Sequence, residues 1–248
     1  MLRVALAALA FAAIILAWMA ARLVIPSPDV FLPAPDAVVR SLIDMFVNDG
    51  FAEDILASVW RVSAGFLLAI VVGYPLGVAI GTSKIWEGLI QPLNDFARYL
   101  PVAALVPLVI VWFGITDVQK IVVIFLGCVF QFVPMVADTT RRVPRELVEL
   151  GRSLGMRKQT LIQRVIIPAT APEIYDHSRI VLGWAWSYVV VAEVVAASSG
   201  VGHVIVQAQR FIKTDEVLAG VLTIGVIGVV FDQLFRMPKR YLFRWSQS

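Results

Sequence analysis

Long apolar runs separated by short polar segments dominate this chain. Residues 4–25 and 55–82 are two such runs, and each is long enough to cross about 30 Å of hydrocarbon as a helix. Together the predicted spans cover residues 4–25, 55–82, 97–114, 121–138, 180–197 and 217–235. The pattern predicts an all-α polytopic membrane protein with about six transmembrane helices, since helices satisfy their own backbone hydrogen bonds in lipid.

The N-terminal run has a rival interpretation as a cleaved signal peptide. It exceeds a signal core of about 7–15 residues and lacks a clear small-x-small cleavage site, so we expect residues 1–25 to be a retained N-terminal transmembrane helix.

Residues 26–54 contain several prolines and then a helical apolar spacing, which predicts an outer connector and an amphipathic helix. That helix either packs against the bundle or contacts a partner. Residues 55–248 then form the core.

The second run carries glycines four or eight residues apart, which are Gly65, Gly73, Gly77 and Gly81. This spacing places small residues on one helix face, where a neighbouring helix can approach closely. Arg61 lies near one end of the same run. It either extends its side chain to the membrane surface or lines a path, and we expect the first.

Composition and charge support a membrane location. The chain of 248 residues is 59% hydrophobic and 16% charged, and its mean hydropathy is +0.83, more apolar than a soluble domain of this size. Its net charge of +3 gives no reason to expect nucleic acid. Fifteen of the 21 Lys and Arg residues, Arg244 in the tail among them, fall on one side of the predicted spans. The positive-inside rule makes that side, and both termini, cytoplasmic. Cys128, the one cysteine, sits in an apolar run and is interpreted as a small hydrophobic residue that faces either the core or the lipid.

The longest charged segment is residues 141–172, RRVPRELVELGRSLGMRKQTLIQRVIIPATAP. Pro144 precedes a first helical pattern, Gly155 separates it from a second, and Pro168 follows the second. Proline suits the start of a helix but not its interior, and glycine accepts the backbone conformation that ends one. The segment is therefore predicted to form a helix, a turn and a helix.

This segment resembles the cytoplasmic loop of ABC importer permeases. In that family Glu-Ala-Ala is followed after three residues by Gly, and after nine more by Ile-x-Leu-Pro. Here ELG at 149–151 is followed by Gly155 and then by VIIP at 165–168. The resemblance implies that the short helix around the glycine docks on an ATPase subunit. Gly151 departs from the pattern and should loosen the first helix by roughly 1 kcal/mol relative to Ala.

Three other blocks resemble the permeases of sulfonate, nitrate and taurine importers. They are FLPAPDAVV from residue 31, the spacing R-x-x-P-x-x-A-x-x-P-L-x-x-x-W-F-G from Arg98, and WAWSYVVVAE at 184–193, which contains Trp184, Trp186 and Glu193. The resemblance implies the type I ABC importer permease fold in a bacterial inner membrane. It also implies a second permease copy, two cytoplasmic ATPase subunits that bind ATP and Mg²⁺, and an external solute-binding protein. This chain itself would hold no cofactor.

Candidate site residues fall into two groups. For ATPase coupling they are Glu149, Gly151, Arg152, Ser153, Leu154, Gly155, Arg157, Lys158 and Pro168; for the translocation pathway they are Glu193, Gln131 and Trp184. Glu193 stands out because a carboxylate among apolar neighbours costs several kcal/mol unless it is paired or solvated. It either faces the path or lies at the outer mouth, solvated or bonded to a neighbouring span. His203, in a glycine-rich turn, is more simply structural.

The sequence therefore favours the permease subunit of an ATP-driven importer for a small anion such as taurine, an alkanesulfonate, nitrate or bicarbonate. It has no phosphate-binding loop, nucleophile elbow or metal-ligand pattern, so we expect it not to be an enzyme and ATP hydrolysis to belong to another chain. The alternatives are a secondary transporter that works without an ATPase and a membrane scaffold that transports nothing.

Overall fold

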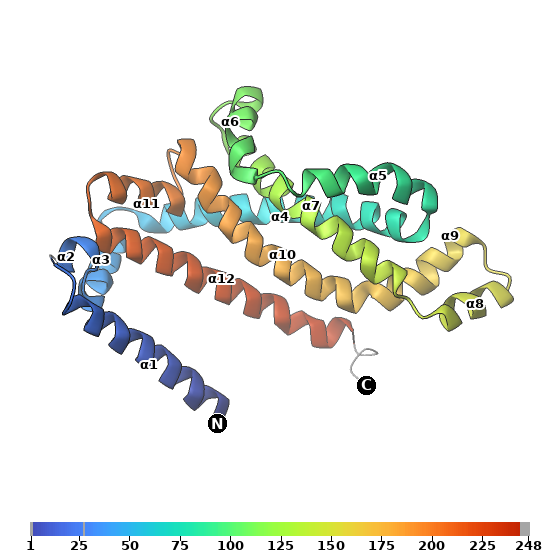
Figure 1. Cartoon of the computed structure of the whole chain (residues 1–248), viewed down its shortest axis with the longest axis horizontal. Coiled ribbons are helices and arrows are strands. Elements are labelled where there is room, and N and C mark those ends of the chain that lie inside the picture. The colour runs from blue at the N-terminus through green and yellow to red at the C-terminus, as the bar shows by residue number, and fades with distance from the viewer. Residues whose placement is uncertain (1, 27, 244–248) are drawn as a thin grey trace.

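The computed structural model describes residues 2–26 and 28–243 as a bundle of helices (Figure 1). No strand occurs among these residues, in agreement with the all-α prediction, and Arg244 lies outside them. In chain order the helices are α1 (Leu2–Arg22), α2 (Pro28–Phe31), α3 (Pro35–Asn48), α4 (Phe51–Thr82), α5 (Lys84–Ala97), α6 (Val102–Phe113), α7 (Asp117–Arg141), α8 (Arg145–Ser153), α9 (Lys158–Leu161), the π-helix η1 (Ile162–Ile166), α10 (Ile167–Ala196), α11 (Val201–Arg210) and α12 (Thr214–Leu242).

Four helical segments are long and apolar enough to cross a membrane: α4, α7, α12 and the continuous stretch Lys158–Val195. The pair α5 and α6 makes a fifth span if it is counted as one broken helix. In α1 the segment Leu9–Arg22 counts as a shorter apolar helix, so the sixth span stays a prediction. Helices α8 and α9 lie at one end of the bundle and α3 and α11 at the other (Figure 1). We call these the α8 end and the α11 end.

The third predicted span, residues 97–114, is not one continuous helix. Residues 84–97, most of which lie between the second and third predicted spans, form helix α5, and α6 meets α5 at an angle of 99°. Pro101 is the N-cap of α6, and the break falls just before it because proline disfavours helical backbone in the preceding residue. Helix α6 has only 12 residues, about 18 Å, which is too short to cross a bilayer alone.

The glycine stripe of α4 lies against α7, as the spacing predicts. A Cβ atom built at Gly65 would lie 2.7 Å from Cγ2 of Ile124, and one at Gly77 would lie 2.5 Å from Cβ of Val136. Gly73 and Gly81 meet Phe132 and Thr140 in the same way. The two helices therefore pack with their backbones close together, which is how van der Waals contact replaces the hydrophobic effect inside a membrane.

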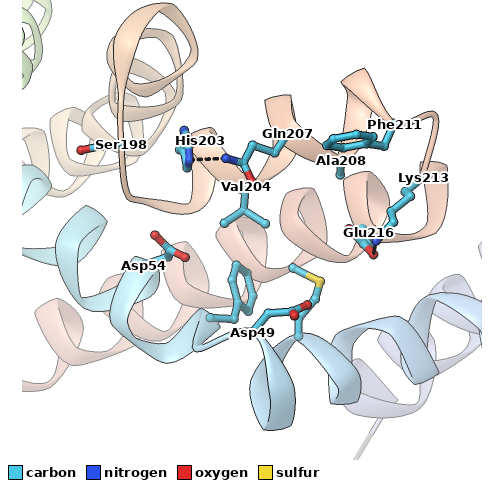
Figure 2. Close-up of a pocket in the computed structure, with 12 residues that line it drawn as sticks. Asp49, Asp54, Ser198, His203, Val204, Gln207, Ala208, Phe211, Lys213 and Glu216 are labelled. Carbon is cyan, nitrogen blue, oxygen red and sulfur yellow. Dashed lines mark hydrogen bonds and ion pairs between the residues drawn. The ribbon is translucent and has the colours of Figure 1, made fainter.

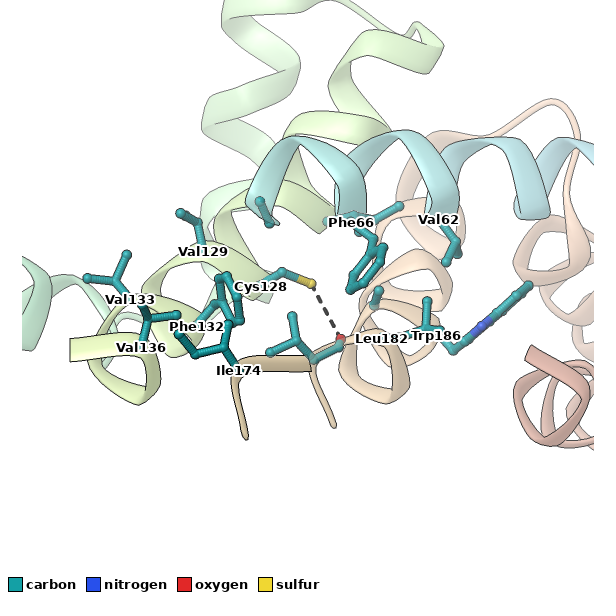
Figure 3. Packing of buried hydrophobic residues seen from close by; sticks show 14 of the residues in the cluster. Val62, Phe66, Cys128, Val129, Phe132, Val133, Val136, Ile174, Leu182 and Trp186 are labelled. Atoms are coloured by element: carbon teal, nitrogen blue, oxygen red, sulfur yellow. Dashed lines mark hydrogen bonds between the residues drawn. The ribbon is translucent and has the colours of Figure 1, made fainter. Parts of the chain in front are cut away.

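The main core continues from α7 to α10 (Figure 3). Cys128 of α7 is completely buried, and its thiol donates a weak hydrogen bond of 3.8 Å to the carbonyl of Val181. Of the two alternatives for Cys128, the structure shows the one in which it faces the core. Phe132 and Trp186 fill the space on either side.

At the α11 end a smaller core joins α3 to the bundle. Val38 and Met45 of α3 are buried together with Phe51, Val201 and Ala219. Of the two alternatives for this amphipathic helix, the structure shows the packed one.

The close contact of α4 with α7 predicts the effect of added volume. Gly77→Ala should lower the free energy of unfolding by about 1–3 kcal/mol, because the new methyl group has no room beside Val136 and the carbonyl of Val133. Gly225→Ala in α12 is the matched control, since its Cβ would meet nothing within 4 Å. Thermal unfolding of the purified protein in detergent measures both. Equal melting temperatures for the two variants would contradict this packing.

Candidate functional site

The predicted turn of the 141–172 loop has a well-defined geometry. Helix α8 starts after Pro144 and ends at Ser153, and Gly155 takes a left-handed backbone with φ of 74°. The N–H of Gly155 donates to the carbonyl of Arg152 at 2.9 Å, and the N–H of Met156 donates to that of Gly151 at 3.1 Å. These two bonds form a Schellman motif, which satisfies the last carbonyls of the helix and requires glycine at the turn.

The second helix of the loop does not end at Pro168, contrary to the prediction. Helix α9 continues through η1 directly into α10, and Pro168 lies in the first turn of α10. The N–H of Ile167 bonds to the carbonyl of Ile162, five residues earlier. This wider π-helical turn accommodates a proline, which lacks an N–H and crowds the carbonyl four residues before it. The loop is therefore joined to the transmembrane helix without a flexible break.

Most of the predicted coupling residues lie on the surface. Glu149, Arg152, Ser153, Leu154, Gly155, Arg157 and Lys158 are all exposed. Gly151 is buried instead, and a Cβ atom there would collide with Cδ1 of Leu161. The absence of a side chain at Gly151 thus allows α8 to approach α9. This packing role is separate from the lower helix propensity of glycine relative to alanine.

Sequence reasoning missed a stripe of exposed leucines on α8. Leu147, Leu150 and Leu154 are exposed, the last two by 60% and 69%. Their spacing of three and four residues places them on one helix face. The period was readable in the sequence, but only the structure shows that this face covers nothing in the described part of the chain.

At the α11 end, Arg61 joins four parts of the chain. It is only 2% exposed, so the expectation that it reaches the membrane surface is wrong. Its Nη1 donates to Oε1 of Glu193 at 2.8 Å and to the carbonyl of Ser199 at 2.8 Å. Its Nε donates to Oδ1 of Asp117, also at 2.8 Å. Arg61 therefore connects α4 to the start of α7, the end of α10 and the loop before α11.

Glu193 has protein partners for both carboxylate oxygens. The residue is 1% exposed. The hydroxyl of Ser58 donates to its Oε1 at 2.8 Å, and the N–H of Gly202 donates to its Oε2 at 2.9 Å. Of the alternatives for Glu193, this geometry matches a carboxylate bonded to neighbouring elements. A role in the pathway stays a prediction.

The other two pathway candidates lie elsewhere. Trp184 is half-buried against the main core and precedes Glu193 by nine residues, about 14 Å along α10. Gln131 is half-buried in α7 near the middle of the bundle. The structure does not bring the three side chains into one cluster, and their lining of a pathway stays a prediction.

A cleft of about 410 Å³ opens between α3, α11 and the start of α12 (Figure 2). His203 lies on its rim and hydrogen-bonds Gln207 one helical turn later at 2.8 Å, which fits a structural role. Nζ of Lys213 donates to Oε1 of Glu216 at 2.7 Å, and this hydrogen bond raises the pKa of Lys213 above its ordinary value.

The charge network predicts strong coupling between its members. Arg61→Gln should lower the free energy of unfolding by about 3–5 kcal/mol, because it leaves Glu193 buried without its cation. The double variant Arg61→Gln/Glu193→Gln should be less destabilised than the sum of the single variants by about 1–3 kcal/mol. Arg40→Gln, which breaks an exposed pair with Asp36, should cost less than about 1 kcal/mol. Denaturant unfolding in detergent measures the free energies of Arg61→Gln, Glu193→Gln, the double variant and Arg40→Gln. A double variant whose loss equals the sum of the two single losses would refute the coupling.

Comparison with known proteins gives the chain its family. Residues 69–241 match the family described as binding-protein-dependent transport system inner membrane component. The aliphatic sulfonates permease protein SsuC of Bacillus subtilis, a putative assignment, is 35% identical over 88% of this chain and 79% of its own length. The taurine transport system permease protein TauC of Escherichia coli is 34% identical over 92% and 84%.

A solved structure shares the fold. The inward-facing MetNI methionine ABC transporter includes a chain that matches 79% of this one and 96% of its own length, with a TM-score of 0.66 and 18% identity. The matched span of 69–241 includes α7, the 141–172 loop and α10. The chain is therefore an ABC importer permease, a multi-pass member of the inner membrane component family of binding-protein-dependent transport systems.

Proposed function

We propose that α8 is the surface through which a separate cytoplasmic ATPase drives this permease, and that α10 transmits the movement across the membrane. The observation that supports this most directly is the exposed leucine stripe, Leu147, Leu150 and Leu154, on a charged helix. Exposed apolar residues are expected in lipid, but the exposed charges of Glu149, Arg152 and Arg157 beside them favour a location in water for α8. A leucine face in water fits a hydrophobic groove on a protein partner.

The leucine face would supply part of the free energy of docking. Burying one leucine side chain contributes about 1.5–3 kcal/mol. Exposed cations at Arg152, Arg157 and Lys158 surround the stripe and would select an acidic rim on the partner. In this proposal ATP and Mg²⁺ are bound by the partner ATPase subunits, and this chain contributes no residue to hydrolysis.

Helix α10 is the element that fits a mechanical role. With α9 and η1 it forms the continuous span Lys158–Val195, so a shift of the loop moves one rod. Its 30 residues reach about 45 Å, from the α8 end to Glu193 in the charge network at the α11 end. We propose alternating access, in which ATP binding draws two such loops together and opens the opposite side. ATP acts because it binds the two states with different affinity.

The proposal includes an assembly and an orientation. The α8 end and both termini are cytoplasmic, because most Lys and Arg residues gather there. A second copy of the permease completes the translocation path, two ATPases bind the two α8 surfaces, and an external solute-binding protein delivers the cargo to the α11 end. The relatives named for taurine and aliphatic sulfonates support a small anion as that cargo.

Two other functions are distinguishable by experiment. A secondary transporter would carry out uptake in proteoliposomes that lack nucleotide, and a scaffold would carry out none. The family match favours the ATP-driven importer over both.

The leucine stripe predicts which substitutions release the ATPase. Leu150→Ser and Leu154→Ser should each weaken its binding about tenfold or more, because each removes one buried apolar contact. Leu23→Ser is the matched control, since Leu23 is exposed in the segment that joins α1 to α2, and α2 lies at the opposite end of the bundle from α8 (Figure 1). Co-purification in detergent and ATPase activity in proteoliposomes measure the effect.

Charge reversal tests the rim separately. Arg157→Glu/Lys158→Glu should also reduce co-purification, and more so at low salt, where electrostatic attraction is least screened. Undiminished recovery of the ATPase with both the leucine and the charge variants would contradict α8 as its docking surface.

A further inference from the structure

Another cleft lies at the α8 end of the bundle and contains cations from two helices. It has a volume of about 780 Å³ and lies between α10 and the C-terminal part of α12. Arg179 comes from α10, and Arg236 and Lys239 come from α12. Neither the coupling surface on α8 nor the charge network at the α11 end includes these residues.

Two of the three cations have carboxylate partners. Arg179 donates to Oδ1 of Asp232 at 2.7 Å, and Lys239 donates to Oδ2 of Asp176 at 2.5 Å. The spacing of four residues between Asp232 and Arg236 would allow an ion pair within α12, but Asp232 pairs with Arg179 instead. Arg236 is exposed in the cleft and has no ion-pair or hydrogen-bond partner among the described residues. One fixed positive charge is therefore available to a ligand.

The apolar part of the lining indicates what kind of ligand fits. Met237 and Tyr241 also line the cleft and are 64% and 74% exposed. Met237 lies near the end of the candidate span Thr214–Lys239, and Tyr241 lies two residues beyond it. Tyrosine is enriched where a helix leaves the bilayer, and basic clefts between helices at this level suit anionic lipid headgroups. A free phosphate ion would use the cations but not this apolar surface.

We propose that this cleft binds an anionic phospholipid, with Arg236 contacting the phosphate and Met237 and Tyr241 flanking the first part of the acyl chains. One phosphodiester carries a single negative charge, and it would be the counterion that Arg236 does not have among the described residues. The ion pairs Arg179 with Asp232 and Lys239 with Asp176 hold α10 and α12 together beside it. A bound lipid would thus contact both helices. The proposal requires only a membrane location and does not depend on the assignment of α8 to an ATPase.

Native mass spectrometry of the intact protein in mild detergent tests the site. The probe is short-chain phosphatidylglycerol, with phosphatidylcholine and inorganic phosphate as comparison ligands. Arg236→Gln should weaken phosphatidylglycerol binding about five- to tenfold. It should weaken phosphatidylcholine binding much less, because the choline cation already offsets the charge of the phosphate in that lipid. Arg236→Lys should retain most of the affinity. Arg210→Gln is the matched control, an exposed arginine at the opposite end of the bundle.

Each contrary result has a distinct meaning. An equal loss of phosphatidylglycerol affinity in Arg236→Gln and Arg210→Gln would overturn the site and show that the lipid is attracted to the protein's positive charge in general. Inorganic phosphate that displaces the lipid at equal concentration would show a simple anion site. Unchanged lipid binding with reduced ATPase co-purification in Arg236→Gln would assign the cleft to the ATPase, whereas a failed coupling surface on α8 would leave lipid binding intact.

Discussion

The buried ion pair between Arg61 and Glu193 is the constraint on which the arrangement of this protein depends. An ionised side chain in a low-dielectric interior is stable only with a partner and with hydrogen bonds to its remaining atoms. Here Ser58, Asp117 and the N–H of Gly202 complete the set. Because the partners come from α4, α7, α10 and the start of α11, satisfying two charges fixes the relative positions of four elements.

The two ends of the bundle are held by different forces. At the α11 end the buried charges tie helices together, and between the ends the glycines of α4 bring it close to α7. At the α8 end a cleft of about 510 Å³ separates α8 from the ends of α4 and α7. The loop is thus rigidly joined to α10 yet loosely packed on the bundle. That combination suits an element that receives force from a partner and passes it along one helix.

Local features were predictable from the sequence, and tertiary ones were not. The glycine stripe from Gly65 to Gly81 and the turn at Gly155 follow from residue type and spacing alone. The partner of Glu193 lies 132 residues away, so no local pattern points to Arg61. The course of the helix past Pro168 depends on a π-helical turn, which residue preferences do not determine. The restriction that Pro101 places on Leu100 was readable in the sequence, but the angle of 99° between α5 and α6 was not.

The central claim is that α10 moves as one rod between the two ends. Spin labels at Gln163→Cys near the α8 end and Val195→Cys near the α11 end, both exposed positions of the continuous segment Lys158–Val195, report distances between the two permease copies by double electron–electron resonance. Each is placed in a Cys128→Ala background and assembled with the ATPase. A non-hydrolysable ATP analogue should shorten the distance between the 163 labels and lengthen that between the 195 labels. A change at 163 with none at 195 would contradict movement as one rod.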